Sequence, residues 1–173
     1  YKYGATDVVA REKMHNASCI AGMAFTNAFL GLNHSMAHKL GGDYHIPHGR
    51  ANAILLPYVV EYNAQKPTKF ATFPKYEKFI ADEKYAKIAH YIGKGGKTVE
   101  ESVKNLVQAI RDLEREVNAP VSIQECGIDE KLFFDNLQRL SENAHEDQCT
   151  TANPRYPLIS EISELYTKAY YGK

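Results

Sequence analysis

Apolar side chains recur every three or four residues along most of the chain, which is the spacing of one face of an α-helix. The first such series runs from about Thr6 to Leu32, and apolar residues also fill the other faces of its second half. A helix that is apolar most of the way round is usually buried, so we expect this helix to run through the centre of the domain. A second series spans Ala51 to Tyr62.

Amphipathic helices are also predicted in the second half of the chain, at residues 99–117, 133–144 and 162–170. Thr98 and Glu101 have the spacing of a capping box at the start of the first of these. Loops are predicted at residues 66–74 and 93–96. Because strand-like alternation is missing, the sequence predicts an all-α domain of roughly seven to nine helices.

Composition narrows the classes of protein. The 173 residues suffice for one domain with a core. With 21 basic and 21 acidic residues and no basic block, the chain does not resemble a nucleic-acid-binding protein. Its apolar stretches are too short to cross a membrane. Three widely spaced cysteines fit a reducing cytoplasm and not a disulfide scaffold. Because the first residue is Tyr1, we interpret the start as lying within a longer protein.

Histidines cluster in one short part of the chain, where four of the seven lie between His34 and His48. His34 and His38 are four residues apart, so on a helix they project from one face. The Pro47-His48-Gly49 turn can direct a third imidazole back towards them, and the Gly41-Gly42 pair would end the short helix in between. Imidazole nitrogen binds Fe, Zn, Ni and Cu, so all three are candidate ligands. A lone histidine pair is more often a surface or core feature, and that alternative stays open.

Two segments of the chain resemble the signature of the iron-containing (group III) alcohol dehydrogenases. They are residues 31–38 (GLNHSMAH) and 46–53 (IPHGRANA), which match both histidine elements and their separation. Residues 73–89 and 147–159, the latter with the sequence DQCTTANPRYPLI, resemble the bifunctional aldehyde/alcohol dehydrogenase subgroup.

The resemblance implies a fold and a set of site residues. Residues 1–173 would be the C-terminal helical domain of the dehydroquinate synthase-like architecture, without the nucleotide-binding domain. One Asp and three His would hold the metal, with His34 and His48 as two of them. His38 would line the cleft near the nicotinamide and is our candidate for proton transfer, with a purely polar wall as the alternative. Phe25 would pack against the substrate.

The chain departs from the family pattern at the remaining two ligands. These come from an upstream Asp-x-x-x-His element, whereas Asp7 is followed four residues later by Arg11. We therefore expect the chain alone to be inactive.

The resemblance also implies an activity and partners. The intact enzyme would interconvert acetaldehyde and ethanol with NAD(H), with Fe²⁺, or alternatively Zn²⁺, as the Lewis acid. The rest of the polypeptide would supply most of the NAD site and an aldehyde dehydrogenase activity. A homo-oligomer or filament is expected, with no nucleic acid and no membrane as partner. Two alternatives remain: a zinc-dependent relative similar to glycerol dehydrogenase, and a non-catalytic helical interaction module.

Overall fold

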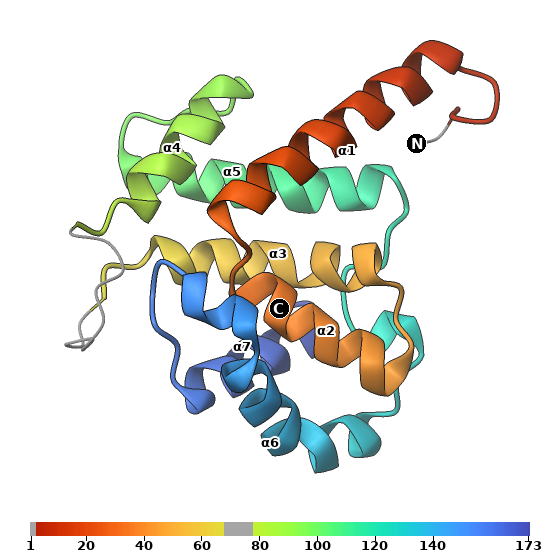
Figure 1. Ribbon diagram of the computed structural model, residues 1–173, viewed down its shortest axis with the longest axis vertical. Coiled ribbons are helices and arrows are strands. Elements are labelled where there is room, and N and C mark those ends of the chain that lie inside the picture. The colour runs from red at the N-terminus through yellow and green to blue at the C-terminus, as the bar shows by residue number, and fades with distance from the viewer. Residues whose placement is uncertain (1–2, 68–77) are drawn as a thin grey trace.

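The computed structural model describes residues 3–67 and 78–173, and these ranges contain α-helices and short 3₁₀ helices but no strand (Figure 1). The all-α prediction is thus confirmed. The elements are α1 (Val8–Ala28), α2 (Leu32–Tyr44), α3 (His48–Ala64), α4 (Ala81–Tyr91), α5 (Val99–Glu116), η1 (Gln124–Cys126), α6 (Glu130–Glu146), η2 (Gln148–Ala152) and α7 (Ile159–Tyr171). Most of the loop predicted at 66–74 lies outside the described residues. No described helix has both the length and the apolar character that a membrane span requires.

Helix α3 is the centre of the packing, with α2, α5 and α7 against it. Its apolar residues join those of α2, α6 and α7 in one buried core, in which Phe133 stacks on Tyr170 with ring centroids 4.7 Å apart. The buried Tyr166 hydroxyl donates a hydrogen bond to the Met36 carbonyl, 2.9 Å away, and so ties α7 to α2. A second, smaller core joins α3, α4 and α5.

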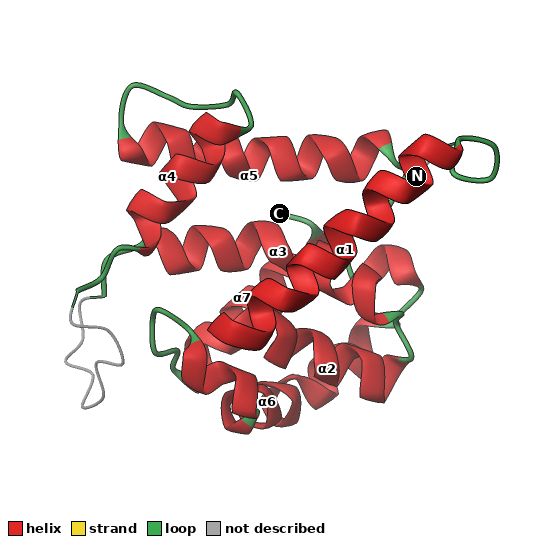
Figure 2. Ribbon diagram, turned by 45° about the horizontal axis from the view of Figure 1, so that its top comes forward, coloured by secondary structure: helices red, strands yellow, loops and turns green. Residues whose placement is uncertain are grey.

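Helix α1 differs from the prediction, because it is not buried. None of its residues is buried, and Met14, Ile20 and Met23 are each more than half exposed. Figures 1 and 2 show α1 as an arm that diverges from the other helices. The helix is apolar, as the pattern indicates, but an apolar face becomes buried only where another element covers it. The described residues contain no such element.

The helix boundaries around the histidines also differ from the prediction. The first helix ends at Ala28, where Phe29 adopts a φ of 64°, and does not continue to Leu32. The Gly41-Gly42 pair does not end α2, which continues to Tyr44 and closes with His45 in the left-handed conformation. Glycine inside a helix costs only about 1 kcal/mol. The buried Leu40 and Ile46 on either side of the pair hold this segment against the core.

Helix α5 begins close to the predicted residue. The Thr98 side chain accepts a hydrogen bond from the Glu101 backbone N–H at 3.1 Å, as in a capping box. The Glu101 carboxylate accepts from the backbone N–H of Lys97 at 2.7 Å, one residue before the position that the motif predicts.

A histidine cluster as the candidate functional site

The imidazole rings of His34, His38 and His48 lie next to one another. Their centroids are 6.2 Å apart for His34 and His38, 5.3 Å for His34 and His48, and 5.6 Å for His38 and His48. The structure therefore brings the three predicted histidines together. Phe25 lies on the exposed helix α1 with 47% of its surface accessible, so its assignment to the substrate site rests on the sequence resemblance alone.

The position of the histidines follows from the amphipathic character of α2. One face of the helix, which includes Leu32, Met36 and Leu40, is fully buried in the core. His34 and His38 each lie two residues from these positions and therefore point to the opposite side, where they are half-buried. His48 is the first residue of α3, which packs against α2. The sequence suggested that His48 lies in a turn, but the structure places it in the first turn of a helix.

The surroundings of His34 favour its neutral form. Partial burial and the two neighbouring histidines, His48 and then His38, lower its pKa. Burial disfavours the charged ring because it removes water, and the neighbouring imidazoles repel a second positive charge. A neutral imidazole is the form that binds a metal ion.

An asparagine pair holds His48. The Asn52 amide nitrogen is 3.1 Å from His48 Nε2 and 3.0 Å from the His48 carbonyl oxygen. Asn33 donates in turn to the Asn52 side-chain oxygen at 2.8 Å. Because the Asn33 amide donates to that oxygen, the Asn52 nitrogen is the group facing His48. Nε2 then accepts this hydrogen bond with its single lone pair, so a metal ion that binds His48 through Nε2 would have to displace the Asn52 amide.

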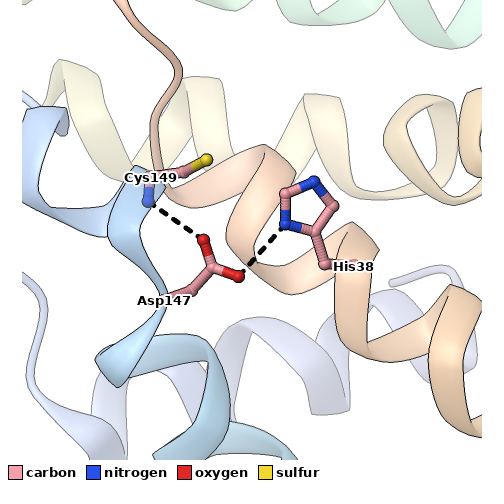
Figure 3. A group of neighbouring side chains, drawn as sticks. All are labelled: His38, Asp147 and Cys149. Carbon is pink, nitrogen blue, oxygen red and sulfur yellow. Dashed lines mark hydrogen bonds and ion pairs between the residues drawn. The ribbon is translucent and has the colours of Figure 1, made fainter.

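Asp147 is a site residue that the sequence did not single out, although it begins one of the segments that carry the resemblance. Its Oδ2 is 3.1 Å from His38 Nδ1 and 2.9 Å from Lys39 Nζ, while Oδ1 accepts from the Cys149 backbone N–H at 2.9 Å (Figure 3). Burial alone would raise the pKa of this carboxyl. The hydrogen bonds from Lys39, Cys149 and His38 outweigh burial and hold the pKa well below its usual range. Asp147 is therefore a carboxylate.

Cys149 is a packed thiol and not a nucleophile. It is 2% exposed, and burial together with the adjacent Asp147 raises its pKa to about 11. One potential ligand atom each from His38, Asp147 and Cys149 lies within 4.8 Å of the other two. Since metals bind the thiolate and this thiol stays protonated near neutral pH, the group is better explained by the hydrogen bonds in Figure 3 than by a metal site.

Asn153 fixes the start of the helix that carries His34. Its side-chain oxygen accepts from the Leu32 backbone N–H at 3.2 Å and from Asn63 at 3.1 Å, and its amide donates to Asn63 at 2.8 Å. A Cβ atom at Gly31 would lie 3.0 Å from this oxygen, so the close approach favours glycine there. The sequence placed this asparagine in a motif but gave no sign of its distant partners.

Arg155 has a structural role. Its guanidinium lies 2.9 Å from the Glu161 carboxylate and 4.0 Å from the centre of the Tyr62 ring. It therefore fastens the segment before α7 to the end of α3.

Comparison with known proteins identifies the family. The family described as "Fe-containing alcohol dehydrogenase family, C-terminal" matches residues 2–170. An aldehyde-alcohol dehydrogenase of Streptococcus pneumoniae is 50% identical over 166 residues, which cover 96% of this chain and 19% of the relative. A NADPH-dependent butanol dehydrogenase of Clostridium saccharobutylicum is 43% identical, and the match covers 96% of this chain and 39% of the relative.

A solved iron-containing alcohol dehydrogenase from Thermococcus thioreducens shares the fold, with a TM-score of 0.81 and 35% identity, and the match covers 96% of this chain and 39% of that one. The chain spans between about a fifth and two fifths of the length of these relatives. Its sequence and its fold place the chain in the Fe-containing alcohol dehydrogenase family, in the C-terminal part of that family's proteins.

Proposed function

We propose that this chain is the helical, metal-binding part of an iron-dependent alcohol dehydrogenase that interconverts acetaldehyde and ethanol with NAD(H). The observation that carries the proposal is the approach of His34 and His48, whose rings are 5.3 Å apart on two packed helices. The match to aldehyde-alcohol dehydrogenases supports the substrate pair, and the family description supports iron.

The donor atoms of this chain fit part of a metal site. Burial and the neighbouring imidazoles lower the pKa of His34, which favours its neutral, metal-binding form, and an ion bound at His48 Nε2 would replace the hydrogen bond from Asn52. Imidazole ligands of this kind suit both iron and zinc. Two more ligands, one of them an aspartate, would come from the part of the relatives' length that this chain does not span. When bound, a divalent ion would supply Lewis-acid polarisation of the substrate oxygen.

Two further roles are proposed, for His38 and for Phe25. His38 would exchange a proton between the substrate oxygen and solvent, a role suited to a side chain that is 35% exposed and next to both ligands. Phe25 would form part of the apolar substrate wall.

The exposed apolar side chains of α1 support burial of this helix by the rest of the polypeptide. Assembly into an oligomer or filament stays a proposal from the resemblance.

A metal assay with a kinetic assay on the full-length protein tests the proposal. We expect about one iron per subunit and NADH formation that depends on ethanol. His45→Asn is a suitable control because His45 is an exposed histidine with a φ of 55°, which asparagine tolerates. This control should keep both properties. Stoichiometric zinc without iron would support the zinc-dependent alternative, and a protein without bound metal or activity would contradict the proposal.

A further inference from the structure

We infer that Asp147 is a positioning residue that fixes the ring orientation and the tautomer of His38, an inference that rests on the proposed role of His38. The two residues are 109 positions apart, on η2's N-cap and on α2. Their contact is therefore made by the tertiary fold.

The Asp147 carboxylate is held from three sides. The Cys149 backbone N–H donates to Oδ1, and the Lys39 ammonium and the His38 ring both lie within 3.1 Å of Oδ2. Its side chain is only 9% exposed, whereas that of His38 is 35% exposed. The carboxylate is thus fixed in the interior, and the ring that it contacts reaches towards solvent.

This arrangement decides which nitrogen of His38 carries the proton. A carboxylate can only accept hydrogen bonds, so His38 Nδ1 must be the donor. In the neutral ring the proton then lies on Nδ1, and Nε2 has a free lone pair. Figure 3 shows Nε2 turned away from Asp147. Nε2 is therefore the atom that can accept a hydrogen bond or a proton from a hydroxyl group.

Lys39 contributes to keeping Asp147 ionised. Its ammonium group lies 2.9 Å from the same oxygen that His38 contacts. This positive charge favours the ionised carboxylate. Asp147 therefore stays an ionised acceptor for the His38 Nδ1–H and orients the ring.

Asp147→Ser is the variant that separates the contact with His38 from the hydrogen bond to the Cys149 backbone. Serine caps the first turn of a helix about as well as aspartate, so the hydrogen bond to the Cys149 backbone N–H can be kept. Its side chain is too short to reach His38. Lys39→Met is the matched control, because it removes the other partner of Oδ2 and leaves the contact between Asp147 and His38.

The first test measures the tautomer directly in the 173-residue chain. Long-range ¹H–¹⁵N NMR at about pH 8.5, roughly two units above the ordinary imidazole pKa, distinguishes a proton on Nδ1 from one on Nε2. We expect Nδ1–H for His38 in the unmodified chain and in Lys39→Met, and a majority of Nε2–H in Asp147→Ser. An Nε2–H signal in the unmodified chain overturns the inference, even if the variant does not fold. So does an unchanged tautomer in a folded Asp147→Ser variant.

The second test uses the full-length enzyme. Asp147→Ser should lower kcat for ethanol oxidation about 10- to 100-fold, with KM and bound metal nearly unchanged. In a His38→Ala background the same substitution should have no further effect, because Asp147 acts through His38. A merely structural role would instead give losses that multiply, and that result overturns the inference. An unmodified enzyme without ethanol oxidation would contradict the proposed function, while the NMR result would still decide the tautomer.

Discussion

The three neighbouring histidines have different surroundings, and these differences suggest different roles. His34 is partly buried and kept neutral by its neighbours, and His48 accepts a hydrogen bond from Asn52. His38 alone contacts a carboxylate. Chain spacing would treat His34 and His38 as equivalent, but the partners of their rings separate them.

We expect His48→Ala in the full-length enzyme to remove bound metal and alcohol oxidation together, because we propose His48 as one of four metal ligands. His38→Ala should keep the metal and lower kcat by about 10²–10⁴-fold, the usual contribution of a general acid or base. Metal content and steady-state kinetics measured on the same preparations check both. Equal loss of metal in the two variants would mean that His38 is itself a ligand.

Phe25→Ala should change which alcohols the full-length enzyme prefers. Truncation of a core aromatic costs about 3–5 kcal/mol, but Phe25 is 47% exposed in this structure, so the 173-residue chain should lose much less. Relative kcat/KM for ethanol and longer alcohols, with urea unfolding of the chain, measures both effects. Unchanged preference together with a large loss of stability would indicate a core role.

Glu114 should make the stability of the chain depend on pH. It is 6% exposed, and its Oε1 has no hydrogen-bond partner within the described residues. Burial raises its pKa from 4.5 to about 7, although Arg111 and Arg115 oppose the shift. Between pH 4.5 and about pH 7 the folded state therefore binds more protons than the unfolded state, and the free energy of unfolding falls as the pH rises through this range.

Glu114→Gln should therefore stabilise the chain at pH 8 by on the order of 2 kcal/mol and have little effect near pH 4.5. Urea unfolding at both pH values measures the difference. Glu100→Gln is the control, since Glu100 lies on the same helix and its side chain is 80% exposed. A stabilisation that is equal at both pH values would argue against the titration of Glu114.

At the scale of elements, α2 and α1 illustrate two ways in which an apolar pattern is used. Helix α2 buries one face against α3 and α6 and leaves the other for the histidines. Helix α1 carries apolar residues around its surface, yet none of its residues is buried. The same kind of pattern therefore gives a core helix in one case and an exposed arm in the other.

Ile20→Ala on α1 should cost less than about 0.5 kcal/mol in the 173-residue chain, because Ile20 is 62% exposed. In the full-length protein, where we propose that α1 is covered, the cost should rise towards 2 kcal/mol or more. Leu40→Ala is the control, since Leu40 is fully buried and should cost about 2–5 kcal/mol in both. Chemical denaturation of both proteins gives these values. Equal small effects of Ile20→Ala would mean that α1 stays exposed.

The whole molecule provides a folded core and part of a site. Its helices hold His34 and His48 at a ring distance of 5.3 Å, and under our proposal an aspartate outside this chain would supply the negative charge that offsets a divalent ion. We expect the 173-residue chain alone to show no dehydrogenase activity and to bind ferrous or zinc ion weakly. Isothermal titration calorimetry tests this. Tight binding of one ion that disappears in His34→Ala would show that the chain contains a complete site, with His38 or His45 as the first further ligand to examine.

Local patterns were sufficient to predict much of the fold. Helices α3, α5, α6 and α7 were each located from their apolar periodicity, because i, i+3 and i+4 spacing reports a helical face without knowledge of its partner. The same spacing placed His34 and His38 on one face of α2, and the quoted motifs identified the family.

Only the tertiary structure decided the features that depend on distant partners. The sequence could not reveal that α1 lies uncovered, because burial depends on what packs against a helix and not on the helix alone. It also could not show that α2 continues through Gly41-Gly42, since packing of the neighbouring residues outweighs a small local preference. The contact between His38 and Asp147 joins residues 109 positions apart, which no local spacing encodes. The sequence by itself thus predicted most of the helices and the three candidate histidines, while only the fold placed His48 at the start of α3 and brought in the carboxylate that orients His38, because long-range contacts form only when the helices pack.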